Sequence, residues 1–225
     1  MNILIFGGAG FLGRNLVREL VNDHNVLVAD IESSFIGDCL KIDICIASQV
    51  DMVIKEFSPD IIINLAARTD LEGENLSEYR INWQGPLNIH KSISELPNPP
   101  LFIHFSSMLV CRMGVVPNSM TSYCPDTAYG ESKAKSEKTL IDLPKNYPLL
   151  ILRPTTVWGE DAGKPYSTFI WLVSRLGWIK LSIFDSKRDF CHVDNLTKLL
   201  SEIISLKKTF KSGYFNCFYI SDSQR

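Results

Sequence analysis

Short runs of apolar residues alternate along this chain with longer segments in which apolar residues recur every three or four positions. The runs are almost continuously hydrophobic, as expected of strands that are buried on both faces of a sheet. They cover Ile3–Phe6, Val26–Ala29, Ile61–Leu65, Leu101–Phe105 and Leu149–Leu152, and helical spacing is found in segments such as Leu12–Val21 and Ala47–Phe57. Because strands that alternate with helices need crossover connections, the pattern predicts an α/β fold with a parallel sheet between two layers of helices. Ligand sites in such folds lie at the carboxyl ends of the strands.

The pattern becomes less regular after the fifth apolar run. Loops that contain glycine and proline surround an apolar helix predicted near Thr168–Leu176, and a final helix is expected over about Asp194–Leu206, before one more apolar run at Tyr214–Ile220. We therefore expect a core over residues 1–157 and a smaller part over residues 158–225, with the final helix packed back on the core.

The composition excludes several classes of partner. The chain of 225 residues is 45% hydrophobic and 21% charged, with a net charge of −2, and its basic residues are scattered. We therefore expect no nucleic-acid partner and no membrane partner. The longest apolar run, Tyr166–Ser174, is too short to span a bilayer, and the first residues lack the features of a signal peptide, so a cytoplasmic protein is expected. The six cysteines include no C-x-x-C pair, and together with the four histidines they indicate reduced thiols and no metal site.

Three glycines, Gly7, Gly10 and Gly13, directly follow the first apolar run. Gly7 allows the strand to turn with a positive φ, Gly10 lets backbone amides approach a pyrophosphate, and Gly13 lets the next helix pack closely on the sheet. The N-terminus of that helix carries partial positive charge that suits a phosphate. A glycine triad alone is a weak signal, but its position between a buried strand and an amphipathic helix predicts a dinucleotide-binding turn.

An acidic residue, Asp30, ends the second apolar run. At this position a carboxylate either faces solvent in a turn or accepts hydrogen bonds from both hydroxyls of an adenosine ribose, and the glycine turn upstream favours the second reading. A 2′-phosphate on that ribose would be repelled by Asp30 and Glu32, with no arginine beside them to compensate. The sequence therefore predicts NAD rather than NADP as the cofactor.

Three further residues, Ser107, Tyr129 and Lys133, have the chemistry of a catalytic site. Tyr129 and Lys133 share one face of a helix that the segment Pro125–Thr127 is expected to cap. Ser107 follows the fourth apolar run, so its hydroxyl would project at the sheet edge that receives the dinucleotide. The charges of Lys133 and of an oxidised nicotinamide are expected to lower the pKa of Tyr129, so that the phenol can take a proton from an alcohol. A serine hydrolase fits less well, because Ser107 lacks the G-x-S-x-G pattern.

Taken together, these residues resemble the extended short-chain dehydrogenase/reductase family, the group of NAD-dependent nucleotide-sugar epimerases, dehydratases and reductases. The resemblance covers nearly the whole chain and implies a Rossmann-like, doubly wound parallel sheet with NAD as cofactor and a nucleotide sugar as substrate. The matching motifs come in the family's order: the glycine turn, Asp30, Asp43-Ile44, Asn64–Ala67, Asn82, Ser106-Ser107, Tyr129–Lys133, Leu152–Pro154 and Arg188–Asp194.

The resemblance also implies which residues bind NAD. The implied set is Gly7, Gly10, Phe11, Leu12, Gly13, Asp30, Asp43, Ile44, Leu65, Ala66, Ala67, Tyr129, Lys133 and Thr155. Within it, Asp43 and Ile44 would hold the adenine, while Leu65–Ala67 would line the nicotinamide-side ribose and the pyrophosphate.

The catalytic and substrate-binding roles follow from the same resemblance. Tyr129 matches the family's catalytic acid/base, Lys133 its ribose-binding lysine and Ser107 the residue that polarises the substrate. Thr156 matches a position beside the sugar, and Arg188 one that contacts the nucleotide diphosphate.

Two departures from the family pattern concern the substrate side. Cys111 stands where the family usually has tyrosine, and the chain is shorter than complete family members, so that its substrate-binding part, 158–225, is expected to be truncated. Met108 and Leu109 occupy the place of the acidic pair that dehydratases carry after the serine, so the sequence favours an epimerase over a dehydratase. The alternatives are a deoxysugar reductase, or a non-catalytic NAD-binding sensor or assembly protein. The family likeness also implies a homodimer, built on the helices near 77–94 and 129–143.

Overall fold

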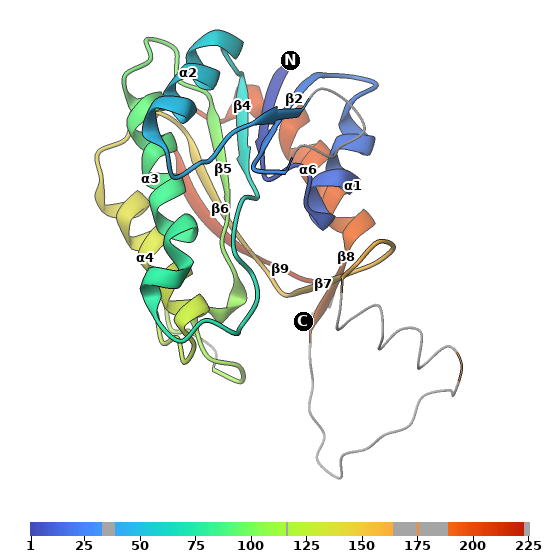
Figure 1. Ribbon diagram of the computed structural model, residues 1–225, viewed down its shortest axis with the longest axis vertical. Helices are drawn as coiled ribbons and strands as arrows, with labels where there is room; N and C mark the ends of the chain where they lie inside the picture. Colours follow the sequence, from blue (N-terminus) through green and yellow to red (C-terminus); the bar gives the residue numbers. More distant parts are fainter. Residues whose placement is uncertain (33–38, 116, 164–174, 176–188, 223–225) are drawn as a thin grey trace.

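This computed structural model describes residues 1–32, 39–115, 117–163, 175 and 189–222 of the chain. A seven-stranded parallel sheet forms the centre of this described part (Figure 1). The strand order is β3-β2-β1-β4-β5-β6-β9. The strands are β1 (Asn2–Phe6), β2 (Asn25–Asp30), β3 (Cys39–Lys41), β4 (Ile61–Asn64), β5 (Leu101–Phe105), β6 (Leu149–Pro154) and β9 (Phe215–Ile220). The chain order reverses at β1, and such a reversal places a ligand crevice at the carboxyl ends of the central strands.

Helices cover both faces of the sheet (Figure 1). On one face lie α1 (Phe11–Leu20) and α6 (Val193–Ser205), which pack against each other. On the other lie α2 (Ala47–Phe57), α3 (Arg80–Ser94) and α4 (Ala128–Asp142). Shorter elements complete the described part: the 3₁₀ turns η1 (Leu76–Tyr79), η2 (Met108–Val110) and η3 (Lys207–Thr209), and a separate parallel pair of strands, β7 (Thr156–Trp158) and β8 (Phe190–His192).

Alternation along the central strands explains the two-sided core. In β1, Ile3 and Ile5 pack with the α1 and α6 side, whereas Leu4 and Phe6 pack with the α2 and α3 side. All four side chains are at most 1% exposed. A strand that is covered on both faces needs apolar residues at every position, which is why the sequence reads as continuous hydrophobic runs rather than as an alternating pattern.

The structure confirms the predicted α/β fold and each of the five strands expected from the apolar runs. The apolar run near the end of the chain forms β9 beside β6, and the final helix lies within a residue of its expected bounds. The sequence did not predict β3 or the β7–β8 pair. The helix expected near Thr168–Leu176 and the residue Arg188 fall outside the described residues, apart from position 175. In the described part, no helix is both long and apolar enough to cross a membrane.

Candidate functional site

Several residues of the predicted motifs lie at the carboxyl edge of the sheet, because each ends or directly follows one of five neighbouring strands. Across the sheet the order is Asp30 as the last residue of β2, then Gly7 after β1, Leu65 after β4, Ser106 after β5 and Thr155 after β6. Backbone hydrogen bonds continue the ladder into these residues, for example from Leu65 N to Phe6 O (2.8 Å) and from Ser106 N to Leu152 O (2.8 Å). The fold thus gathers residues distant in sequence along one edge.

Two of the three glycines in the turn are required by the fold itself. Gly7 has a φ of 80°, and a Cβ there would overlap the backbone of Leu65 and Ala66. A Cβ on Gly13 would lie 2.5 Å from the carbonyl oxygen of Gly7, where α1 packs against the turn. Both positions therefore require glycine for steric reasons.

The third glycine, Gly10, has no such structural reason. It is exposed, its φ is −72°, and the nearest atom to an added Cβ would be Gly7 O at 3.4 Å. Gly10 is also the N-cap of α1, and no side chain there bonds the first amides of the helix. Open space in front of uncapped helix amides is the arrangement that accommodates a phosphate group.

Asp30 holds the glycine turn against the end of β2. Its Oδ2 accepts a hydrogen bond from Ala9 N (3.0 Å), and its Oδ1 accepts one from Glu32 N (3.1 Å). A carboxylate has about four lone-pair positions, so two remain for a ligand such as the two hydroxyls of a ribose.

The adjoining segments frame the same edge. Asp43 Oδ1 accepts a hydrogen bond from Cys45 N (2.8 Å), while the buried side chain of Ile44 packs where Gly85 of α3 leaves room for it. Leu65, Ala66 and Ala67 are partly exposed at the end of β4. Phe11 and Leu12, the first residues of α1, are likewise partly exposed beside the turn.

The three predicted catalytic residues come together in the structure. The Ser107 hydroxyl is close enough to the Tyr129 phenol to lower its pKa, and the ammonium of Lys133 lies 6.0 Å from the centroid of the Tyr129 ring. All three are nearly buried, with exposures of 7%, 8% and 3%. Lys133 Nζ donates to Phe105 O (2.9 Å), the last residue of β5.

Without a bound dinucleotide, the pKa of Tyr129 is raised rather than lowered. Burial raises the pKa of Tyr129 to about 12, and the hydrogen bond with Ser107 only partly opposes this effect. Burial also lowers the pKa of Lys133 to about 8, against the attraction of Glu137. The sequence showed the helical spacing, but it did not show that both groups are removed from water, which disfavours either charged form.

Two contacts position the predicted catalytic residues, and the sequence indicated only one of them. A Cβ on Gly130 would overlap the carbonyl oxygen of Leu109, so this glycine lets η2, which follows Ser107, lie directly on α4. Thr127 caps α4 by accepting a hydrogen bond from Gly130 N (3.0 Å), as the sequence predicted for the 125–127 segment. Gly130 could have been noticed only as a glycine inside a predicted helix.

Asn82, one of the motif residues behind the family resemblance, joins two segments of the site. Its side chain accepts from Arg68 N (2.8 Å) and donates to Arg68 O (3.0 Å), and it also donates to Ser132 Oγ (2.9 Å). Ser132 Oγ in turn donates to Tyr129 O (2.6 Å). This chain of bonds ties the segment after β4 to the helix that carries Tyr129.

Buried hydroxyls without a protein partner lie at the same edge. Ser106 Oγ and Thr155 Oγ1 are among the buried polar side-chain atoms of the described residues that make no hydrogen bond. Such groups are rare in folded proteins unless a ligand or water satisfies them. Thr156, the predicted substrate contact, begins β7 and is partly exposed. No group of three or more potential metal ligands occurs among the described residues.

A family model described as NAD dependent epimerase/dehydratase family matches residues 3–217 of the chain. UDP-glucose 4-epimerase from Vibrio cholerae is 29% identical over 92% of the chain and 67% of its own length. dTDP-4-dehydrorhamnose reductase from Aggregatibacter actinomycetemcomitans is 30% identical over 70% of the chain, which spans only 52% of that enzyme.

Solved structures show the same fold. The structure of the Bordetella bronchiseptica enzyme WbmG in complex with NAD aligns with 98% of this chain, and the alignment covers 72% of the WbmG chain, with a TM-score of 0.76 and 25% sequence identity. ADP-L-glycero-D-manno-heptose-6-epimerase from Helicobacter pylori covers 99% of the chain and 77% of its own, with a TM-score of 0.80 and 22% identity.

Proposed function

The chain belongs to the NAD-dependent epimerase/dehydratase family, and we propose that it binds NAD and epimerises a nucleotide-activated sugar. The observation that carries this proposal is the meeting of Ser107, Tyr129 and Lys133 at the sheet edge that also holds the glycine turn and Asp30. These groups serve acid–base chemistry on a hydroxyl beside a bound dinucleotide.

The residues at the sheet edge fit NAD. Open space at Gly10 and the uncapped start of α1 would accept the pyrophosphate, and Asp30 would bind the adenosine ribose. The unpaired hydroxyls of Ser106 and Thr155 would gain partners near the nicotinamide end. When bound, NAD supplies an acceptor of hydride for the oxidation of a sugar alcohol.

The protein side of the reaction is a proton transfer at the Tyr129 phenol. Alone, this phenol has a pKa of about 12 and stays protonated at neutral pH, so it needs added positive charge nearby to act as a base. Lys133, with a pKa of about 8, is mostly charged at pH 7 and provides part of that charge. Ser107 holds the substrate oxygen through its hydroxyl while Tyr129 takes the proton.

Residues after Ser107 favour epimerisation over dehydration. Dehydration of a 4-keto sugar needs an acid and a base at the neighbouring carbons, and Met108 and Leu109 of η2 offer neither. A sugar-nucleotide reductase is the second candidate, because the segment Asn64–Asp70 resembles that of deoxysugar reductases and such enzymes are among the relatives. A reductase would consume a reduced dinucleotide in each turnover, whereas an epimerase would not.

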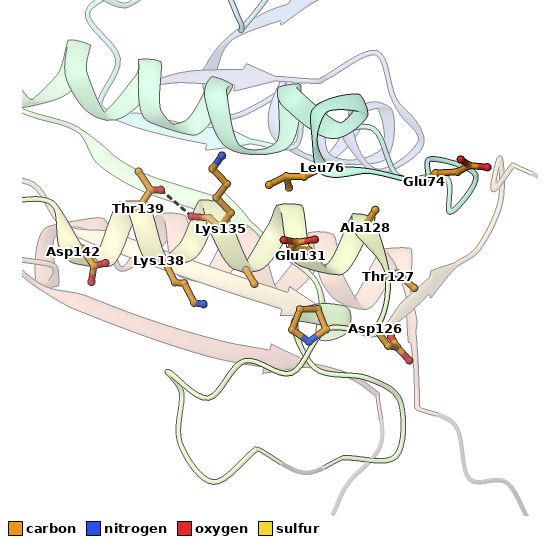
Figure 2. Close-up of a pocket in the computed structure, with 12 residues that line it drawn as sticks. Glu74, Leu76, Asp126, Thr127, Ala128, Glu131, Lys135, Lys138, Thr139 and Asp142 are labelled. Atoms are coloured by element: carbon orange, nitrogen blue, oxygen red, sulfur yellow. Dashed lines mark hydrogen bonds between the residues drawn. The ribbon is translucent and has the colours of Figure 1, made fainter.

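Assembly as a homodimer through α3 and α4 is part of the proposal. A groove of about 780 Å³ runs along the outer face of α4, where it meets the segment that leads into η1 (Figure 2). Residues of both charges line it, among them Glu131, Lys135, Lys138 and Asp142. Such a mixed surface suits a symmetric contact, in which each copy presents both charges to the other.

The proposal is tested by incubating the NAD-loaded protein with UDP-, GDP- and dTDP-linked sugars and analysing the products. We expect an epimerised sugar from at least one of these substrates. Tyr129→Phe should lower the turnover by about 10²- to 10⁴-fold and leave the affinity for NAD unchanged. Tight NAD binding without any product across the panel would favour a non-catalytic NAD-binding protein instead.

A further inference from the structure

Two cysteines face each other between the predicted catalytic residues. Cys111 follows η2 and Cys124 precedes the cap of α4, so they lie on the two segments that join Ser107 to Tyr129. The two residues form an isolated parallel bridge, held by hydrogen bonds from Cys124 N to Val110 O (3.0 Å) and from Arg112 N to Cys124 O (2.9 Å). The Cys111 thiol donates a hydrogen bond to Ser122 O (3.2 Å), two residues before Cys124, and the nearby Cys124 thiol is among the groups that raise the pKa of Cys111.

This geometry suits a disulfide bond. Paired residues on neighbouring strands lie ~4.8 Å apart, within the range of about 4.4–6.8 Å between the Cα atoms of disulfide-bonded cysteines. Directly paired positions also carry their side chains on the same side of the bridge, as a disulfide requires. Among the described residues, no other cysteine is paired with a cysteine on a neighbouring strand; the remaining four are Cys39, Cys45, Cys191 and Cys217.

The two thiols differ in solvent exposure, and this difference indicates which of them reacts first with an oxidant. Cys124 is partly exposed and open to a small oxidant, whereas Cys111 is 3% exposed and lies behind it. Burial, with the neighbouring thiol, raises the pKa of Cys111, so Cys111 is the poorer first nucleophile.

We propose that Cys111 and Cys124 are an oxidation site, which a hydroperoxide converts reversibly to a disulfide. The Cys124 thiolate attacks one oxygen of hydrogen peroxide, breaking the O–O bond to give a sulfenic acid and hydroxide, which takes up a proton to become water. The Cys111 sulfur then attacks the Cys124 sulfur, forming the S–S bond and displacing the sulfenic oxygen as a second water. The two thiols together lose two electrons and two protons, and the peroxide is reduced to two water molecules.

The bond would act on the predicted catalytic site without contacting the substrate. The disulfide would fix the segment after Ser107 to the segment before Tyr129 and close the loop between them. Met120 in this loop also accepts a hydrogen bond through its carbonyl oxygen from Arg153 Nη2 (2.7 Å). The inference concerns thiol chemistry alone and does not depend on the proposed function.

The experiment uses the full chain carrying Cys39→Ser and Cys45→Ser, so that the other partly exposed thiols are absent. After treatment with hydrogen peroxide, free thiols are alkylated and the protein is digested for mass spectrometry. We expect one peptide pair linked through Cys111 and Cys124, a rise in Tm of about 6–12 °C from closure of the loop, and loss of both after treatment with dithiothreitol. Cys111→Ser in the same background should leave Cys124 as a sulfenic acid that dimedone traps.

Three results would overturn the proposal. One is recovery of both cysteines as alkylated thiols after peroxide treatment. Another is over-oxidation of Cys124 without any linked peptide. The third is an equal rise in Tm in the Cys124→Ser variant, which would show that the stabilisation has another cause.

Discussion

Replacement of Gly10 by alanine should weaken binding of the dinucleotide without lowering the stability of the fold. Gly10 has a φ of −72° and ψ of 174°, which any residue adopts, and an added methyl would meet only Gly7 O, at 3.4 Å. The protein itself therefore tolerates the methyl group. A pyrophosphate at the N-terminus of α1 would not, because the methyl would stand between the phosphate and the backbone amides.

The magnitudes follow from this geometry. Loss of glycine at an N-cap costs roughly 0.5 kcal/mol, and the lower entropy of the unfolded chain offsets about as much, so the Tm should change by less than about 4 °C. Displacing the phosphate from one charge-assisted amide bond costs about 1.5–3 kcal/mol, which weakens NAD binding about 10- to 100-fold.

The matched contrast is Gly7→Ala. Gly7 has a φ of 80°, and its added Cβ would overlap the backbone of Ala66, so this variant should lose at least about 2 kcal/mol of stability. Thermal unfolding and titration calorimetry with NAD measure both quantities for each variant. If Gly10→Ala folds normally and binds NAD as tightly as the parent, the phosphate does not lie at this turn and the reasoning fails.

Three further substitutions test the support of the site. The pKa of Lys133 is lowered to about 8 in the folded protein, against 10.5 in the unfolded chain. Between these pH values the unfolded chain binds more protons than the folded protein, so the free energy of unfolding of the parent should rise relative to that of Lys133→Met as the pH increases from about 8 to 10.5. Denaturant titrations at several pH values measure this difference, and a difference that stays constant would contradict the prediction. Asn82→Ala leaves the backbone of Arg68 unpaired and should cost about 2–4 kcal/mol by urea unfolding; an unchanged midpoint would show that these bonds contribute little. Glu137→Ala removes the partner that accepts from Arg153 Nε (2.9 Å) inside the core, and should cost about 3–5 kcal/mol by the same assay; a loss below about 1 kcal/mol would mean that water or Tyr219 replaces the carboxylate.

The fold could be predicted because its strands are buried on both faces. Continuous apolar runs such as Ile61–Leu65 and Leu101–Phe105 leave little choice of structure, and the helices between them impose parallel order. The three residues of β3 carry too little pattern to be recognised, with Cys39 half-buried and Leu40 and Lys41 exposed. The short pair β7–β8 is equally hidden, because its partners are distant in sequence.

Several predicted site residues lie at one edge of the sheet because the strands that they end or follow are parallel neighbours. The order of the motifs along the sequence was enough to predict this arrangement. The electrostatics of these residues could not be predicted in the same way. The pKa of Tyr129 depends on how completely its phenol is buried, and the close packing of η2 on α4, with Gly130 against Leu109, is a tertiary contact that contributes to this burial. The pairing of Cys111 with Cys124 likewise depends on the path of the loop between them and has no signature in their spacing.

The most direct test of the account is a crystal structure of the protein grown with NAD. We predict density for the pyrophosphate over the amides at the start of α1, an adenosine ribose on Asp30, and a nicotinamide ring beside Tyr129 and Ser107. A dinucleotide bound elsewhere, or a nicotinamide position filled by the protein's own side chains, would contradict the proposed function.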